Sequence, residues 1–483
     1  MIDTHKAQHT IDQWRALAEK SLKGRSLESL SHITASQLAI DPLYTERPAS
    51  SEALFPSPLK RWDNRLAVLG ESNAEKNANV LAGLAGGISS LQLSLTHHTQ
   101  GAQLTAVDAK TILNDVQLDI VPLSLVCDME GGSVCARQFT ANATLIESVM
   151  KDLGWDATKN NIAFNADPIG TMAATADPQM KVQDLLKELT ELALHTNQQL
   201  TNSTAVCVNA SCYHNAGGSI EQELVAAIAT ASIYLQAMLD AGMDAQSAND
   251  TLVFQFSCDA DVLSNVVKLR VLKSLWYYVA TKMGVENPHC QLVVESSRRM
   301  QSLMEPWINH LRNVSCATAA AMGGAQTILI HPHDYIDHRF INQSTDKDTA
   351  LSARVARNIP IIISEESNLT FVHDPMAGAY SVENLSANLS NDCWQALQKL
   401  ERAGGLIDAL QSGQYQAQIN QNQQQRIERL QNETDIQVGV NRYVNSANEA
   451  ILGKTTTATD APTELSGKAL KIKRDAQAFE GVA

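Results

Sequence analysis

The chain has 483 residues, of which 44 % are hydrophobic and 18 % are charged, and its formal net charge is −15. This composition is typical of a globular protein with a large core. The acidic balance argues against a nucleic-acid-binding protein, because phosphate recognition requires a basic surface.

The cysteines form neither CxxC pairs nor a cluster with zinc spacing. Several lie in apolar, strand-like runs, where a free cysteine behaves as a small hydrophobic residue. We therefore expect all of them to be reduced and the protein to be cytoplasmic. The N-terminus lacks the apolar segment of a signal peptide, and no run of about 18 apolar residues predicts a membrane span. The eight positions are Cys127, Cys135, Cys207, Cys212, Cys258, Cys290, Cys316 and Cys393.

Residues 1–60 are predicted to form an extended arm. Apolar residues recur at helical spacing in "DQWRALAEKSLKG" (12–24), and Gly24 is a typical helix end. The segment that follows is rich in proline and serine. A long extended segment of this kind usually lies over another part of the same chain or over a partner.

From residue 87 onward, short runs rich in β-branched residues alternate with long helical stretches. Eight such strands predict parallel βα units, and their span of about 290 residues favours a (β/α)8 TIM-type barrel of the α/β class. No GxGxxG follows the first strand, which argues against a dinucleotide-binding domain. The expected strands are 87–95, 118–128, 161–167, 204–214, 251–259, 290–297, 325–334 and 369–374, and the expected helices include 179–199, 219–241, 261–283, 303–322 and 347–358.

After residue 385 the pattern predicts a C-terminal helical segment. The last part is low in apolar residues and is expected to be a linker with a truncated tail. We therefore divide the chain into the arm (1–60), the barrel with its C-terminal helices (61–445) and the linker and tail (446–483).

One alternating set of strand residues is small or polar. Alternate residues of a barrel strand point into the lumen, which large branched side chains normally fill. If this set faces inward, the barrel axis could hold a polar ligand or ordered water; the alternative is that it faces the helices. The set comprises Ser90, Gln92, Ser94, Cys207, Asn209, Ser211, Gln255, Ser257, Val294 and Ser296.

Barrel enzymes place their catalytic residues at the C-terminal ends of the strands. Within "CYHNAGG" (212–218), Tyr213 and His214 are the main candidates, because histidine is the usual acid or base near neutral pH. The alternative is that His214 only bonds a backbone carbonyl at the strand end. "HPHD" (331–334) is a weak metal-site signal without a third ligand. The strand-end candidates are Asp128, Asp167, His214, Asp259, Glu295, His331, His333 and Asp334.

Nearly the whole chain resembles the methylmalonyl-CoA mutase family. "SLKGRSLESL" (21–30) with "ITASQLAIDPLYT" (33–45) resembles the opening of its subunits, and "ADPIGTMAATA" (166–176) resembles the small, non-catalytic subunit. "CYHNAGG" resembles the family's Tyr-His-x-x-Gly element, and "VGVNRY" (438–443) its domain end. The most specific match is 356–386, with Asp374, Pro375, Gly378, Tyr380 and Glu383.

This resemblance implies an adenosylcobalamin-dependent rearrangement that interconverts methylmalonyl-CoA and succinyl-CoA. It implies that acyl-CoA threads along the barrel axis. His214 matches the histidine that hydrogen-bonds the substrate thioester carbonyl in catalytic members, and Tyr213 matches its neighbour.

Three departures argue against catalysis by this chain. Catalytic members carry a carboxylate-binding arginine on the loop after the third strand, but no arginine occurs here between Arg137 and Arg270. They also carry a tyrosine that stacks on the substrate, but no tyrosine occurs between Tyr44 and Tyr213. The cobalt-ligating DxHxxG motif does not occur. Without the arginine, a dicarboxylate substrate would leave an uncompensated buried charge.

The sequence therefore favours the small subunit of a heterodimeric methylmalonyl-CoA mutase, without a cobalamin-binding domain. In this hypothesis Tyr213 and His214 are vestigial, and adenosylcobalamin binds to the large catalytic subunit, which the arm wraps. One alternative is a catalytic acyl-CoA mutase barrel that acts with a separate cobalamin-binding protein. The other is an acyl-CoA-binding regulatory protein.

Overall fold

A closed barrel of eight parallel strands forms the centre of the protein, in the order β10-β3-β4-β5-β6-β7-β8-β9. The computed structural model describes residues 11–46, 48, 61–96, 103–127, 138–156, 158–177, 180–336, 347–445 and 469–480. The predicted (β/α)8 TIM-type barrel is confirmed. Its strands are β3 (Asp63–Ala67), β4 (Ser90–Ser94), β5 (Leu123–Val126), β6 (Ile162–Ala166), β7 (Thr204–Asn209), β8 (Leu252–Cys258), β9 (Gln291–Ser296) and β10 (Thr327–Leu329).

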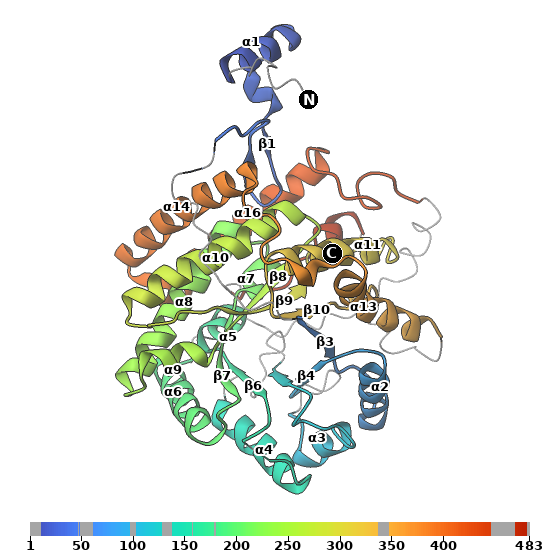
Figure 1. Cartoon of the computed structure of the whole chain (residues 1–483), viewed down its shortest axis with the longest axis vertical. Coiled ribbons are helices and arrows are strands. Elements are labelled where there is room, and N and C mark those ends of the chain that lie inside the picture. Colours follow the sequence, from blue (N-terminus) through green and yellow to red (C-terminus); the bar gives the residue numbers. More distant parts are fainter. Residues whose placement is uncertain are drawn as a thin grey trace, which may run out of the picture.

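Helices surround the strands, as Figure 1 shows. Local sequence explains where they begin: Ser219 and Gln222, for example, form a capping box at the start of α8. Among the described helices, α8 is long and apolar enough to cross a membrane, but 67 % of its most apolar window is buried inside the protein. The helices around the barrel are α2 (Asn73–Ala85), α3 (Ala106–Ile112), α4 (Phe139–Asp152), α5 (Pro168–Thr175), α6 (Val182–Gln199), α7 (Ser211–Asn215), α8 (Ile220–Asp240), α9 (Ala245–Asp250), α10 (Val262–Lys282), α11 (Ile308–Met322) and α13 (Lys347–Glu365).

The first barrel strand, β3, is one that the sequence pattern did not predict. Its sequence DNRLA has one large apolar residue, Leu66, which packs so tightly on α2 that a Cβ on Gly83 would lie 2.8 Å from its Cδ2. β3 closes the ring by pairing with β10 on one side and with β4 on the other. The predicted last strand at 369–374 is wrong, because Leu369–Phe371 is a 3-10 turn (η3) and Asp374 has a φ of +43°.

The strand register decides which residues face the lumen. Phe254 packs on Trp276 of α10, with ring centroids 5.2 Å apart, so the next residue, Gln255, points inward. Register with β8 then places Cys207 and Asn209 inward as well. Of the two orientations left open for the polar set, the inward one holds for these residues and for Ser257.

The other alternative, a helix-facing orientation, holds for Val294 and Ser296. Val294 lies in register with Phe256, which is two residues from the helix-facing Phe254 and so points to the same side. Val294, and Ser296 two residues further along β9, therefore face the helices. Glu295, which lies in register with Ser257, is the β9 residue that enters the lumen.

The lumen is polar and retains space that water can reach. In β4 the polar residues Gln92 and Ser94 are partly exposed, whereas the alternating leucines are buried. Asn209 and Gln255 are also partly exposed, although the residues next to them on the same strands are buried. This arrangement differs from a barrel whose interior is filled by large branched side chains.

The arm packs partly on its own barrel. Its hairpin consists of β1 (His32–Ile33) and β2 (Ala39–Ile40), and Arg429 and Arg426 donate to the backbone carbonyls of Ile33 and Ala35. By contrast, α1 (Ile11–Ser21) has no buried residue and stands away from the barrel (Figure 1).

The C-terminal helices pack outside the barrel and follow the most specific sequence motif. They are α14 (Tyr380–Arg402), α15 (Gly405–Ser412) and α16 (Gln414–Gln431). Arg270 of α10 forms ion pairs with both Asp374 and Glu383, and Glu383 also accepts a hydrogen bond from the Gly378 amide at 2.9 Å. This motif therefore has a structural role, because it fastens the start of α14 to α10.

One cysteine differs from the expectation. Cys127, at the end of β5, is disulfide-bonded. The prediction that all eight cysteines are reduced is therefore wrong, although Cys207, Cys212, Cys258, Cys290, Cys316 and Cys393 are free.

Candidate functional site

Tyr213 and His214 lie on the C-terminal side of the barrel but not on a strand. β7 ends at Asn209, and both residues belong to the short helix α7, so the predicted strand 204–214 is too long. Successive residues of a helix point about 100° apart. Their side chains therefore enter different surroundings and do not form one site.

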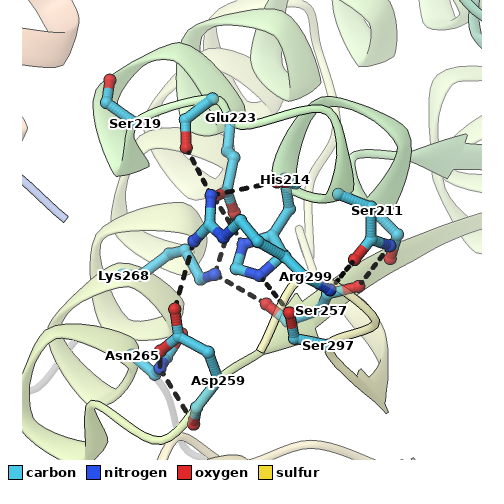
Figure 2. Close-up of polar contacts among 12 residues, drawn as sticks. Ser211, His214, Ser219, Glu223, Ser257, Asp259, Asn265, Lys268, Ser297 and Arg299 are labelled. Carbon is cyan, nitrogen blue, oxygen red and sulfur yellow. Dashed lines mark hydrogen bonds and ion pairs between the residues drawn. The ribbon is translucent and has the colours of Figure 1, made fainter. Parts of the chain in front are cut away.

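His214 is buried in a polar network and uses both ring nitrogens within it. It is 1 % exposed; its Nδ1 lies 2.7 Å from Glu223 Oε1, and its Nε2 lies 2.8 Å from Ser297 Oγ. The other oxygen of Glu223 accepts a hydrogen bond from Lys268 Nζ at 2.8 Å, and Lys268 also donates to the Ser257 carbonyl. Figure 2 shows His214 between these partners.

The charges in this network determine the protonation state of each member. Burial lowers the pKa of His214 to about 4, and nearby Arg299 acts in the same direction. Burial alone would raise the pKa of Glu223, but His214 and Lys268 together lower it to about 2. At neutral pH the network therefore contains a neutral imidazole, a carboxylate and an ammonium group.

This protonation state also determines the direction of the hydrogen bonds. A carboxylate only accepts, so the single ring proton of His214 lies on Nδ1 and points at Glu223. Nε2 is then an acceptor, and the Ser297 hydroxyl donates to it. A histidine in this tautomer has no Nε2 proton with which to bind the carbonyl oxygen of a ligand.

Tyr213 points in a different direction from His214 and packs into the core. It is 2 % exposed and meets Tyr415 of α16 edge-on, with ring centroids 5.9 Å apart. Its hydroxyl has no hydrogen-bond partner among the described residues, and burial raises the pKa of this phenol well above its ordinary value. Its contacts are those of a core aromatic residue.

Arg299 anchors the element that carries His214. Its guanidinium donates to the carbonyls of His214 and Gly218, both at 2.9 Å, and forms an ion pair with Asp259 at 3.1 Å. Burial would raise the pKa of Asp259, but Arg299 lowers it below its ordinary value. Arg299 is 1 % exposed, so this ion pair is shielded from solvent.

The C-terminal helices and tail cover this half of the barrel mouth. Backbone amides of tail residues Leu470, Lys473 and Asp475 donate to Ala173 of α5, Asn215 of α7 and Arg299. Helix α16 contributes further contacts, such as the bond from Asn422 Nδ2 to the Gly217 carbonyl. The C-terminal helices and the tail therefore shield the network around His214 at the barrel mouth, in addition to the barrel elements that surround it.

The other predicted strand-end acids also have internal partners. Asp167 caps α5 and accepts hydrogen bonds from Gly170 N at 3.0 Å and from Tyr234 OH at 2.5 Å. Burial raises its pKa to about 6. Glu295 contacts Ser257 and His331 in the lumen, and Asp128 lies outside the described residues.

The predicted metal signal "HPHD" does not converge on one point. His331 stacks on Tyr335 and pairs with Glu295. His333 stacks on Trp307, and its Nδ1 contacts the Ser352 hydroxyl, which also donates to Asp334 at 2.6 Å. In the described part of the chain, no three His, Cys, Asp or Glu side chains group around a possible metal position.

Sequence reasoning identified His214 but not the residues that define its state. Glu223, Lys268, Ser297 and Arg299 come from α8, α10 and the loop after β9, so no local motif links them. The one available signal was a charged residue inside an apolar helical run, as in "ELVAA" and "VVKL". Such residues are rarely buried unless they are paired.

Arg65 was also overlooked, because it lies on the unpredicted strand β3. Leu66 faces α2, so the preceding residue, Arg65, points into the lumen, where its Nε donates to Ser90 Oγ at 3.3 Å. It is 8 % exposed.

Comparisons with known proteins agree on one family. The family model described as methylmalonyl-CoA mutase matches residues 96–482. The methylmalonyl-CoA mutase small subunit of Streptomyces virginiae is 30 % identical over 98 % of this chain and 75 % of its own length. The small subunit of Propionibacterium freudenreichii subsp. shermanii is 26 % identical over 98 % of this chain and 73 % of its own length. The methylmalonyl-CoA mutase of Escherichia coli is 24 % identical, and the match covers 90 % of this chain and 64 % of that protein.

Proposed function

This chain belongs to the methylmalonyl-CoA mutase family, and on that premise we propose that it is the small, structural subunit of such a mutase. In this proposal a large partner subunit interconverts methylmalonyl-CoA and succinyl-CoA and binds adenosylcobalamin. The small-subunit names of the relatives imply a partner. We further propose a heterodimer. The cytoplasmic location stays a prediction, although one of its grounds, that all cysteines are reduced, does not hold.

The observation that carries this proposal is the state of His214. In catalytic members the matching histidine binds the substrate thioester carbonyl. Here the ring proton points at Glu223, and Ser297 occupies the remaining nitrogen at 2.8 Å. Reversing this arrangement would require moving a proton against a buried carboxylate that Lys268 also stabilises.

The histidines at the strand ends do not fit a cobalt-ligating role. The histidines at the strand ends, His214, His331 and His333, are at most 5 % exposed. Each ring is held by a stacking or hydrogen-bonding partner. These observations support placing the cofactor on the partner subunit, and no reaction step is assigned to this chain.

The arm supports a role in assembly. Its hairpin is fixed to α16 of the same chain, so we assign the partner contact to α1, which has no buried residue and exposes 59 % of Leu17. Residues 49–60 of the proline-rich segment, which were also expected to wrap the partner, lie outside the described residues.

The proposal is tested by assaying the purified chain, the large subunit and the reconstituted complex for isomerisation of methylmalonyl-CoA. We expect turnover by the complex and none by this chain alone. His214→Asn in an assembled complex should leave kcat unchanged if the chain is structural. Loss of turnover in a complex that still assembles would instead favour the catalytic alternative.

The polar lumen gives some support to a second function, that of an acyl-CoA-binding regulatory protein. Gln92, Asn209 and Gln255 face inward and are partly exposed. Calorimetric titration with CoA esters distinguishes the two functions, because a purely structural subunit releases no heat.

A further inference from the structure

A cavity of about 440 Å³ lies outside the barrel, where three distant segments of the chain meet. The turn of the arm hairpin (36–39) forms one wall, the start of α8 (219–222) forms the second, and α14 forms the third with residues between 385 and 392. The hairpin turn is held in place by the protein itself, because Arg426 donates to the Ala35 carbonyl at 2.7 Å. The volume of the cavity is within the range of small-molecule sites.

The lining is apolar at its base and polar at its rim. All three segments contribute aliphatic side chains to the base, which are Leu38, Ile220, Leu385 and Leu389, each at most 7 % exposed. The side chains of Gln37, Asn388 and Asn391 are exposed and form part of the rim. Such a lining is typical of sites for ligands that have both an apolar and a polar part.

Several polar groups of the lining have no internal partner. Ser36 is 7 % exposed, yet its hydroxyl has no hydrogen-bond partner within the described part of the chain. The same holds there for the side-chain amides of Gln37, Asn388 and Asn391. Because buried polar groups normally have partners, an unused hydroxyl at this depth indicates a bound water or ligand.

The charge of the rim is negative. Glu221 and Asp392 line the cavity, and the described residues that line it include no lysine or arginine. Partial burial and the nearby Asp392 carboxylate raise the pKa of Glu221, and Lys399 offsets part of this effect. Two carboxylates that repel each other across one cavity favour the binding of a cation.

Two other kinds of ligand match the lining poorly. In the described part of the chain, no three His, Cys, Asp or Glu side chains group around a possible metal position, and a metal ion gains nothing from an aliphatic base. An anion would meet both carboxylates. It would also find the amides of Ser219 and Gln222 at the start of α8 already used in the capping box.

The chemistry of the lining therefore specifies an organic cation. An ammonium group donates three hydrogen bonds, which suits two carboxylates and one amide oxygen, while an attached alkyl chain covers the aliphatic base. We propose that this cavity binds a protonated alkylamine, with its ammonium group between Glu221 and Asp392. The amine is either a free small molecule or a lysine side chain of a partner subunit. The site does not depend on the proposed role in assembly, because a free amine reaches it in the isolated chain in both cases.

The test is a titration of the full chain with 1,4-diaminobutane and with butylamine at constant ionic strength, followed by calorimetry and by thermal unfolding. A ligand that binds only the folded state raises the melting temperature in a saturable manner. We expect saturation with both amines, and none with 1-butanol or with sodium chloride at the same ionic strength. Repeating the titration in the complex with the large subunit distinguishes the two sources. Loss of diaminobutane binding in the complex assigns the cavity to a lysine of the partner, and retained binding assigns it to a free amine.

Variants connect the response to the two carboxylates. Glu221→Gln and Asp392→Asn should each weaken amine binding by about threefold to tenfold, since each removes one charge that holds the ammonium group. Ser36→Ala should weaken it by a smaller factor. Glu401→Gln is the matched control, because it removes an exposed acid about 14 Å further along α14, outside the cavity lining, and it should bind as the wild-type chain does.

Each further outcome decides the question. Equal affinity in the wild type and in a variant that combines Glu221→Gln with Asp392→Asn overturns the proposal. Equal weakening in Glu401→Gln also overturns it, because the response would then reflect only net charge. If the combined variant does not fold, the two single variants replace it. A folded wild-type chain without a saturable response to either amine, or with the same response to 1-butanol, overturns the proposal as well.

Discussion

The network around His214 and the lumen around Arg65 are two buried polar regions of one barrel, and they differ in how completely their groups are paired. In the network, both nitrogens of His214, both oxygens of Glu223 and the Lys268 ammonium have partners. In the lumen, Arg65 has one hydrogen bond. Internal pairing of this kind fixes structure and leaves few groups with which to bind a ligand, whereas an unpaired buried cation keeps that capacity.

The most direct test of this contrast removes one arginine from each region. Arg299→Met leaves Asp259 buried without its partner and should lower the free energy of unfolding by about 3–5 kcal/mol. Arg65→Met removes an unpaired buried charge and should be neutral or stabilising in ligand-free buffer. Urea unfolding of both variants measures their free energies of unfolding. Equal losses of stability would mean that the two regions do not differ in how their charges are paired.

The pH dependence of stability gives the next largest effect. The folded pKa of His214, about 4, lies below its unfolded value, so the unfolded state binds more protons and stability falls as pH drops from about 6.5 to 4. Asp167, with a folded pKa of about 6, has the opposite effect, and stability falls as pH rises from about 4 to 6. Each shift corresponds to about 3 kcal/mol.

The contributions of His214 and Asp167 oppose each other in this window, and His310, whose pKa burial also lowers to about 4, acts in the same direction as His214. Asp167→Asn removes the opposing contribution, so the stability of this variant should fall by about 3 kcal/mol more than that of the wild type between pH 6.5 and 4. Urea midpoints measured across this window check the result. Equal profiles in the two chains would show that the pKa of Asp167 is not raised in the fold.

The packing of α16 over the His214 region can be tested at Gly217. This residue has a φ of +106°, and an added Cβ would lie 2.4 Å from the Gln423 side chain of α16. Gly217→Ala should therefore cost about 2–3 kcal/mol, from backbone strain plus overpacking. Gly242→Ala is the matched control, because its φ is +89° but no atom lies within 4 Å of the added Cβ. Gly242→Ala should lower the free energy of unfolding by about 1 kcal/mol. Equal losses in the two variants would mean that α16 does not pack closely against the backbone at Gly217.

The smallest expected effect comes from Ser297. Ser297→Ala leaves the Nε2 acceptor of His214 without a donor and should cost about 1–2 kcal/mol. The variant should not gain activity, because Glu223 still holds the ring proton on Nδ1. A shift in the ring nitrogen NMR signals of His214 would confirm that the hydrogen bond has been lost.

The barrel class could be predicted from the sequence because strands such as 252–258 and 291–296 carry dense β-branched and aromatic runs. The strand β3 escaped prediction because a barrel strand needs apolar residues only toward the helices, and here Leu66 largely fills that role. The run at 369–374 was misread because two of its apolar residues, Phe371 and Val372, do not enter the core but stay 71 % and 56 % exposed.

The site was predictable only in part. His214 follows a predicted strand, which is a local feature. Its protonation state depends on Glu223, Lys268 and Ser297, and the barrel brings these together from positions up to 83 residues away in the chain. The inward direction of Arg65 depends on a register that exists only once the ring is closed.

The pairing of β3 with β10 has a consequence for synthesis. Asp63 meets Thr327 across the closing seam, so the ring stays open until about 330 residues have left the ribosome. At roughly 5–20 residues per second, this interval lasts on the order of 15–60 seconds. Throughout it β3 has one unpaired edge, and the growing chain offers a surface on which chaperones or a second nascent chain could act.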